Sequence, residues 1–590
     1  MHRWRFLALV SIAGLTLAAC TPGGVASPTG EATGRATAEE TEGASPSHTE
    51  GGTEYDAMTY PEDGPADCDA EGYTGEFSQI RAVDALTVEF TLCQADVAFL
   101  QKIAFSAFGI NDSDYLEANT PELGDDGTPV AEGSIVENPN GTGPFRFAEW
   151  ARGDHITLEG NPDYWGDAAS TQTLIFRWSE EGAQRLLELQ SGTSVDGIDN
   201  PAPDDFETIE GDPNLALYPR DPMNVFYLGM NNTYEPWNNE QVRQAIAMGI
   251  DRERIVSNYY PAPSEVADYF TPCFIPGGCE GDPWYEFDPE GARELLADAG
   301  FPDGFDTVIQ YRDVFRAYLP EPPVVAQEIQ TQLLENLNIR AEIEPIESGT
   351  YLDMNTAGEL EGLFMLGWGA DYPDQTNFLD YHFGQGAGVK FGDIYEDLAD
   401  VLAEAATETD ADARLELYAE ANNLVREHVP MVPVAHGYSA TAFLADVEGA
   451  HASPLNNELF AGMKAGDRDQ LVFMQNAEPP GLYCADETDG EAFRVCIQML
   501  ESLYSYEIGG TEIQPSLATE CTSDEDEVVW TCTLRDGVTF HDGSELDAND
   551  VVVSYAVQWD AEHPLHVGRT SAFEYFPGLF GGFLNPPAEE

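Results

Sequence analysis

The chain has 590 residues, of which 42% are hydrophobic, and 107 acidic against 25 basic residues give it a formal net charge of −82. This length accommodates two to four globular domains. The charge excludes a nucleic-acid-binding surface, which needs a basic footprint, and charge-driven adhesion to anionic lipid. We interpret the acidity as a source of solubility, as in a saline medium that screens such charge.

The first 20 residues have the pattern of a bacterial lipoprotein signal peptide. "MHRWRF" carries two arginines, and the short apolar run "LALVSIAGLTLAA" follows it. The run ends in "LAAC", which resembles a lipobox in which Cys20 is diacylated. The alternative is an ordinary signal peptide with an incidental cysteine. No internal run of about 18 apolar residues predicts a membrane-spanning helix.

Residues 21–55 are rich in Gly, Ser, Thr, Pro and Glu and almost free of large apolar side chains. Such a segment cannot bury a core and is typical of a flexible tether. Together with the lipobox, it predicts a folded body held at the outer face of the cell membrane, with the lipid as its only attachment to the membrane.

Eight cysteines remain after Cys20. An even number in an exported chain indicates disulfides, and the rival interpretation as zinc ligands lacks any Cys-x-x-Cys pair. The connectivity is open from sequence alone, but the eight fall into neighbouring couples, so we expect these bonds: Cys68–Cys93, Cys273–Cys279, Cys484–Cys496 and Cys521–Cys532.

Strand and helix patterns alternate along the folded part of the chain. Apolar alternation or short apolar runs predict strands at 86–92 and 223–232, and a strand that ends in a Gly, Asp and Pro loop at 362–374. Helical periodicity with terminal caps predicts helices at 180–192, 238–256 (with a second turn after Asp251), 288–301, 324–339 and 414–428. This alternation predicts an α/β fold.

The chain resembles the bacterial extracellular solute-binding proteins of family 5, the peptide and oligopeptide class that serves ABC importers. The resemblance covers most of residues 75–445. Its matching stretches are "NGTGPFRFAEW", "ITLEGNPDYWG", "WNNEQVRQAIAMGIDRERIV", "ARELLADAGFPDGF", "GWGADYPDQTNFLDYHF" and "VREHVPMVPVAHG".

The family's opening segment resembles residues near the end of this chain. "LVFMQNAEPPGLY" is similar to the family's first strand. "WTCTLRDGVTFHDGSELDANDVVVSYAVQW" is similar to the family's early hairpin and helix. In this helix, Asp547 is the N-cap and Asp550 occupies the third helical position. The resemblance implies a circular permutation in which Met463–Gln470 is an exposed connector. The alternative is a fusion in which residues 470–590 belong to a second domain.

The family fold implies a bilobed, periplasmic-binding-protein-like α/β protein of type II. Lobe I would comprise 56–225 and 440–590, and lobe II would comprise 230–435, with crossings near Val225–Met230 and Val432–His436. The lobes would close on a solute and present it to the permease subunits of an ABC transporter. The resemblance implies a monomeric receptor, with no enzyme activity, cofactor or metal.

The motif "GWGADYPD" carries the expected ligand site. In peptide-binding relatives the Asp after "GW.A" pairs with the ligand's ammonium, and by match this is Asp371, flanked by Trp368 and Tyr372. Asp371 could instead cap the loop, and the two aromatics could be core residues. Met365 stands where peptide binders can place an arginine for the peptide carboxylate, which puts recognition of a fixed peptide length in doubt.

Leu482 and Tyr483, after the Pro-Pro turn, are further ligand candidates, with a structural turn as the alternative. A metal site or acid–base chemistry could be built from Asp374, Asp380 and His382. However, carboxylates with this spacing on a loop do not define a glycosidase pair, and no nucleophile motif accompanies them. The competing functions are binding of a non-peptide solute such as an oligosaccharide, a secreted hydrolase and a structural lipoprotein.

Overall fold

The computed structural model describes residues 55–70, 72–124 and 128–587. The predicted signal peptide, Cys20 and the tether up to residue 54 lie outside the described residues. Residues 55–590 form one compact unit. Within its described part, no helix combines the length and the apolar character that crossing a bilayer would require.

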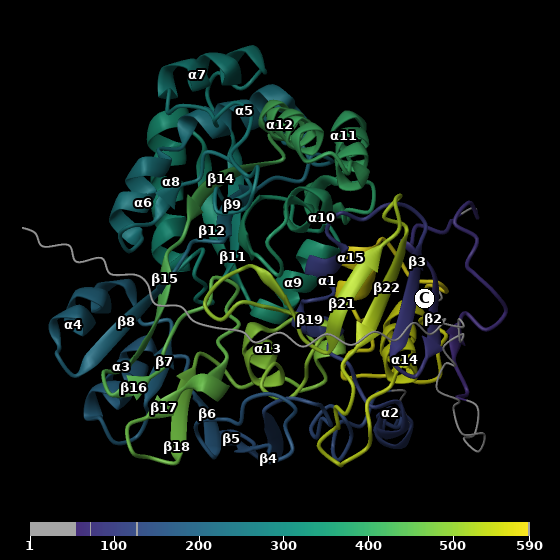
Figure 1. Cartoon of the computed structure of the whole chain (residues 1–590). Coiled ribbons are helices and arrows are strands. Elements are labelled where there is room, and N and C mark those ends of the chain that lie inside the picture. Colours follow the sequence, from purple (N-terminus) through teal and green to yellow (C-terminus); the bar gives the residue numbers. More distant parts are fainter. Residues whose placement is uncertain (1–54, 71, 125–127, 588–590) are drawn as a thin grey trace, which may run out of the picture. The chain divides into compact units, whose positions relative to one another are not determined.

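The middle of the chain, residues 224–436, is built on a six-stranded mixed sheet, and we name it the central region (Figure 1). β11 runs parallel to β12 and β13, and the other pairs are antiparallel. In sheet order the strands are β10 (Glu265–Val266), β14 (Met431–His436), β9 (Asn224–Gly229), β13 (Leu363–Gly369), β11 (Asp306–Arg312) and β12 (Arg340–Ile346).

The helices of the central region pack on this sheet and on one another. α8 contacts β11 and β12, and α5 and α6 contact β14. The helices are α5 (Glu240–Gly249), α6 (Arg252–Tyr259), α7 (Pro289–Asp298), α8 (Pro322–Leu337), α9 (Ser348–Thr356), α10 (Leu379–Phe383), α11 (Glu396–Thr407) and α12 (Ala411–His428), with the 3₁₀ turns η3 (Gln375–Asn377) and η4 (Val389–Phe391).

Residues 55–220 and 439–587 form the second part of the unit, which we name the flanking region. It contains a seven-stranded and a five-stranded sheet. The seven strands, in sheet order, are β4 (Phe145–Ala151), β5 (His155–Gly160), β6 (Thr173–Trp178), β18 (Gln470–Gln475), β7 (Gly197–Asp199), β15 (Ser439–Leu444) and β8 (Leu215–Arg220). The five are β1 (Thr59–Tyr60), β2 (Phe77–Asp84), β3 (Thr87–Leu92), β22 (Val529–Leu534) and β21 (Ala518–Ser523).

Shorter elements complete the flanking region. Its small strand pairs are β16 (Val447–Glu448) with β17 (Lys464–Ala465) and β19 (Tyr504–Tyr506) with β20 (Ile513–Pro515). Its helices are α1 (Phe99–Lys102), α2 (Ser113–Asn119), α3 (Gly182–Ser191), α4 (Phe206–Gly211), α13 (Gly490–Cys496), α14 (Ala548–Trp559) and α15 (Tyr575–Phe580), and its 3₁₀ turns are η1 (Ser106–Phe108), η2 (Pro203–Asp205), η5 (Phe460–Gly462) and η6 (Cys484–Asp486).

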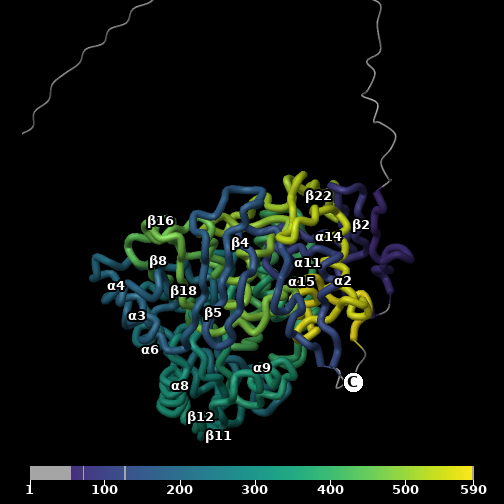
Figure 2. The backbone as a smooth tube through the Cα atoms, turned by 90° about the horizontal axis from the view of Figure 1, so that it is seen from below, coloured from purple at the N-terminus to yellow at the C-terminus, as the bar shows by residue number. Residues whose placement is uncertain are grey.

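Segments from the two ends of the sequence interleave in the flanking region. β18 pairs in parallel with both β6 and β7, and β22 pairs with β3. Figures 1 and 2 both show the early strand β2 beside the late elements β22 and α14. Residues 470–587 therefore share sheets with the first part of the chain and do not form a separate domain.

The predicted connector Met463–Gln470 is exposed only in part. Asp467 to Gln470 are exposed, but Met463 and Ala465 are buried, because β17 pairs with β16 immediately before the chain enters β18. The expectation of an exposed connector was therefore wrong for its first half and is confirmed for residues 467–470.

The chain passes between the two regions at two short adjacent segments, 221–223 and 437–438. Asn224 ties them together, because its Nδ2 donates to the Gly437 carbonyl oxygen at 2.8 Å and its Oδ1 accepts from the Gly437 N–H at 2.9 Å. The segments Val225–Met230 and Val432–His436, where we expected the crossings, include most of β9 and β14 in the central sheet, so the passages lie just outside them.

Caps define several helix starts as predicted. The Asp251 side chain accepts from the Arg254 N–H and begins α6, and Asp288 begins α7 in the same way. At α14, Asp547 and Asp550 form a reciprocal capping box. The four neighbouring cysteine couples are all disulfide-bonded in the structure, closing loops with sequence separations of 25, 6, 12 and 11 residues.

Candidate functional site

The "GWGADYPD" motif lies at the end of β13 and in the turn that follows it. Gly367 must lack a side chain there, because the Tyr318 ring and the Val225 carbonyl oxygen occupy the place of a Cβ. This close packing fixes the end of the strand and therefore the position of Asp371 behind it.

Asn377 on η3 holds Trp368 and Asp371 together. Its Nδ2 donates to Asp371 Oδ2 at 2.9 Å, and its Oδ1 accepts from the Asp371 N–H at 2.9 Å and from Trp368 Nε1 at 3.3 Å. The residue that caps the loop is Asp374, which accepts from the Thr376 N–H at 2.9 Å. The Asp371 carboxylate therefore has side-chain partners rather than backbone ones.

The other oxygen of Asp371 is bonded across the two regions. Tyr575 of α15, 204 positions away in the sequence, donates its hydroxyl to Asp371 Oδ1 at 3.0 Å. The Tyr575 ring packs against Phe105 at a centroid distance of 4.7 Å and against Phe493 at 5.7 Å. Asp371 thus lies at the contact between the central and flanking regions, facing an aromatic group.

Asp371 has no cationic partner among the described residues. Burial raises its pKa to about 6, although the hydrogen bonds from Asn377 and Tyr575 work in the opposite direction. Asp374, three positions along, accepts from Arg414 at 2.8 Å and 2.9 Å, and this pairing outweighs burial and lowers its pKa. Asp371 therefore differs from its neighbour in lacking a counter-charge.

Aromatic rings extend this site on the central side. Trp368 stacks on Tyr381 with a centroid distance of 4.4 Å, and the Lys390 ammonium lies 5.7 Å and 4.9 Å from the centres of these two rings. From the flanking region, α15 approaches the same stack: a Cβ added at Gly578 would lie 3.0 Å from the Tyr381 ring.

The structure places the other predicted ligand residues away from Asp371's carboxylate. Tyr372 is buried, with its hydroxyl 3.0 Å from that of Thr376, and Met365 is buried within β13. Leu482 and Tyr483 are also buried: the Leu482 N–H donates to a backbone carbonyl oxygen, and Tyr483 packs edge-on to Phe573.

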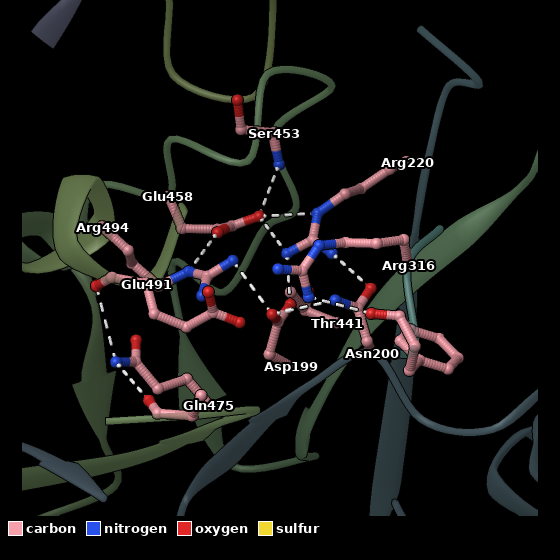
Figure 3. A network of polar contacts seen from close by, with 12 residues as sticks. Asp199, Asn200, Arg220, Arg316, Thr441, Ser453, Glu458, Gln475, Glu491 and Arg494 are labelled. Carbon is pink, nitrogen blue, oxygen red and sulfur yellow. Dashed lines mark hydrogen bonds and ion pairs between the residues drawn. The ribbon is translucent and has the colours of Figure 1, made fainter. Parts of the chain in front are cut away.

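Arg316, which the sequence patterns did not indicate, also lies between the regions. It belongs to the loop after β11, and Figure 3 shows it reaching toward Asp199 of the seven-stranded sheet. Burial lowers the pKa of its guanidinium, but the charges of Glu491, Tyr318, Asp489 and Asp199 raise it on balance. Its single side-chain hydrogen bond in the described structure goes to the carbonyl oxygen of Phe315 at 2.9 Å.

No group of three or more metal-ligating side chains occurs within residues 55–70, 72–124 and 128–587. Asp380 accepts from the Tyr418 hydroxyl at 3.1 Å, and burial raises its pKa to about 7. His382 is bonded through Nδ1 to the Phe378 carbonyl oxygen at 2.7 Å. These side chains belong to the packing of the central region.

The protein consists of two regions joined by two adjacent chain segments, and a carboxylate without a cationic partner lies between them. This arrangement is typical of two-lobed solute receptors. The model of the bacterial extracellular solute-binding proteins, family 5 (middle), matches residues 44–389 and 512–574, more than half of the chain. The chain belongs to this family of extracellular binding proteins, which are not enzymes.

Named relatives agree with this assignment. The chain is 29% identical over 411 residues to di/tripeptide-binding protein 1 of Pseudomonas aeruginosa, covering 69% of this chain and 74% of the relative. It is 28% identical over 394 residues to heme-binding protein A of Haemophilus influenzae, covering 65% and 69%.

Among solved structures, the periplasmic binding protein DppA of Helicobacter pylori, in complex with the peptide STSA, superposes with a TM-score of 0.58 at 27% identity. The match covers 67% of this chain and 75% of that one. The fold is thus the bilobed type II binding-protein fold.

Proposed function

We propose that this protein captures short peptides between two lobes and delivers them to the permease of an ABC importer. The flanking region is lobe I and the central region is lobe II. The di/tripeptide-binding relatives and the peptide-bound DppA structure support a peptide as the solute.

The observation that carries the proposal is the Asp371 carboxylate, desolvated at the contact between the lobes and without a cation among the described residues. A peptide's terminal ammonium supplies the missing charge, because a charge-assisted hydrogen bond to a carboxylate is strongest where water is excluded. The ammonium would share or replace the Tyr575 hydroxyl at Oδ1.

Arg316 supplies a second anchor of opposite sign. Its guanidinium has five N–H groups, and one carbonyl oxygen is its hydrogen-bond acceptor in the described structure. The peptide's terminal carboxylate would take the remaining donors in place of the acidic groups that Arg316 now faces. A receptor with Asp371 and Arg316 then recognises both ends of a short zwitterionic chain.

The test is calorimetric titration of Ala-Gln and its N-acetylated form into the wild type and Asp371→Ala. Truncating one partner of a desolvated charge pair costs about 2 to 5 kcal/mol, so Asp371→Ala should weaken binding of the free peptide by roughly 30-fold or more. Acetylation should weaken binding to the wild type similarly and change little in the variant. Asp380→Asn is the matched control, because this carboxylate on the same segment is bonded to Tyr418.

Equal affinity of Asp371→Ala and wild type for the peptide would contradict the ammonium-binding role. Failure of the wild type to bind any short peptide would favour a non-peptide solute, such as an oligosaccharide. Peptide hydrolysis during the titration, seen by mass spectrometry, would favour a hydrolase instead.

Anchoring to the cell membrane through Cys20 belongs to the same proposal. The signal-like first 20 residues and the tether-like composition up to residue 55 support it. Cys20→Ser should release the protein into the medium or leave it unprocessed. Unchanged membrane retention would mean that the attachment lies elsewhere.

We also propose that the chain is a circular permutation of the order in which the family's segments follow one another. The late strands β18 and β22 support this, because they pair with strands from the early part of the chain. A protease site introduced at the exposed Asp467–Asp469 tests it. Cleavage there should leave both fragments associated and competent to bind peptide. Separation into two independently folded fragments would support the fusion alternative.

A further inference from the structure

Lys390 is a cation without a counter-charge in a chain dominated by acidic residues. The chain has 107 acidic residues, and its only lysines are Lys102, Lys390 and Lys464. Lys102 pairs with Asp96 at 3.0 Å and with Glu76 at 3.2 Å. Lys390 makes no hydrogen bond or ion pair with any described residue, although acidic side chains are plentiful.

Aromatic rings surround the Lys390 ammonium instead. Its Nζ lies 4.9 Å from the centre of Tyr381, 5.7 Å from Trp368 and 5.8 Å from Phe391. Cation–π contacts of this kind attract the ammonium, but they leave its three N–H donors without acceptors. The rings hold the charge in place but do not neutralise it.

The surroundings of Lys390 lack negative charge. Burial lowers the pKa of Lys390 to about 7, and no carboxylate acts against this shift. The neighbouring His382 adds no second positive charge, because burial and the Lys390 charge keep its pKa well below the usual value. The Nε2 atom of His382 is itself buried and has no hydrogen-bond partner in the described structure. An anion arriving here would favour the protonated form of Lys390 and supply the counter-charge that it lacks.

This cation lies beside the proposed peptide anchor. Tyr381 is next to both Lys390 and Asp371. Lys390 lies over its ring, and burial together with the Asp371 charge raises the pKa of its hydroxyl. Trp368, which contacts Lys390, is tied to Asp371 through Asn377. A peptide held by its ammonium at Asp371 therefore brings its own side chains close to Lys390.

We propose that Lys390 binds an acidic side chain of the ligand, so that the receptor prefers peptides containing Glu or Asp to their amide counterparts. The inference rests on the proposed peptide-binding function and adds the chemical class of peptide. Lys390 acts as a specificity-determining residue, and Asp371 and Arg316 hold the peptide's ends.

The experiment compares the dissociation constants of Glu-Ala with Gln-Ala and of Ala-Glu with Ala-Gln, because each pair has the same shape and differs in charge. The wild type should bind at least one acidic peptide about tenfold more tightly than its amide partner. Lys390→Met should reduce that ratio to less than about twofold and leave the affinity for the amide peptides within about threefold. Lys390→Arg should retain part of the preference, and Lys464→Met, in β17 of the other lobe, should retain all of it.

Equal binding of both peptides in each pair by the wild type would overturn the inference, whatever the variants do. A preference that persists in Lys390→Met would overturn it as well. Either result differs from failure of the proposed function, in which no dipeptide binds the wild type. Thermal unfolding of each variant establishes that the titrated protein is folded.

Discussion

Two groups of charged side chains in this protein are organised in opposite ways. In the seven-stranded sheet, Arg220 bonds Asp199 at 2.7 Å and Glu458 at 2.6 Å, and Arg494 bonds the same two carboxylates at 3.0 Å and 3.1 Å (Figure 3). All four side chains are at most 3% exposed.

Asp371 and Lys390, at the contact between the lobes, each lack a partner of opposite charge among the described residues. Burial costs an ionised group several kcal/mol unless it is paired. In the paired group at the seven-stranded sheet, the ion pairs offset this cost, and the charges stabilise the fold. For Asp371 and Lys390 the cost is not offset within the described residues, and a charged ligand can offset it. The difference distinguishes charges that are paired within the fold from the charges that we propose for ligand recognition.

The largest effect should come from breaking the paired group. Arg220→Met leaves Asp199 and Glu458 with only Arg494, and loss of one partner in a buried ion group typically costs about 3 to 5 kcal/mol. Urea denaturation should show this loss in the free energy of unfolding. Arg340→Met, which removes an exposed pair with Asp306, is the control and should cost about 1 kcal/mol or less. A similarly small cost for Arg220→Met would contradict the comparison.

A smaller effect is expected from pH on binding. In the proposed function the ionised form of Asp371 binds the ammonium, and its raised pKa of about 6 means that this form is lost as pH falls through that value. Affinity for Ala-Gln should therefore be about tenfold weaker at pH 5 than at pH 8. The tyrosines that face Asp371, Tyr575, Tyr381 and Tyr506, remain neutral in this range, since burial raises their pKa values.

Asp371→Asn provides the control for this pH dependence and should show much less of it. Ala-Gln is the suitable peptide because it has no acidic side chain to respond to Lys390. Equal affinity of the wild type at the two pH values would show that Asp371 does not bind the ligand in its ionised form.

The smallest effect should be that of Asp371→Asn on stability. Because the native carboxyl has a raised pKa, ionisation of Asp371 disfavours folding above pH 6, and this penalty disappears as pH falls toward 4. Removing the charge should therefore change the free energy of unfolding by no more than about 1 kcal/mol at pH 8, with any gain smaller at pH 5 and lost toward pH 4. A loss comparable to that of Arg220→Met would mean that Asp371 is a structural ion.

Local patterns predicted much of the fold. The helix expected at 288–301 is α7, and the helix expected at 238–256 divides at Asp251 into α5 and α6, because periodicity and capping act within a few residues. The order of strands in the seven-stranded sheet, with β18 between β6 and β7, depends on contacts between distant segments, which no local pattern indicates.

The candidate site was predictable only on its lobe II side. The motif around Asp371 is continuous in sequence, whereas Tyr575 reaches it from 204 positions away, and no local pattern signals that contact. Lys390 left a signal that the charge pattern could have revealed, since it is one of three lysines in a strongly acidic chain. Trp368 and Tyr372 flank Asp371 alike in sequence, but the turn directs Tyr372 into the core.

Gly578 lies where α15 of the flanking region packs against the Tyr381 ring of the central region. The hydrogen atom of this residue lets α15 approach the Tyr381 ring, where even a methyl carbon would lie 3.0 Å away. A bulkier residue there would press on the Tyr381 ring, over which Lys390 lies, and push back α15, which carries the Tyr575 hydroxyl bonded to Asp371. Residue 578 therefore sets how closely α15 can approach the central region, and with it the position of the hydroxyl that meets Asp371.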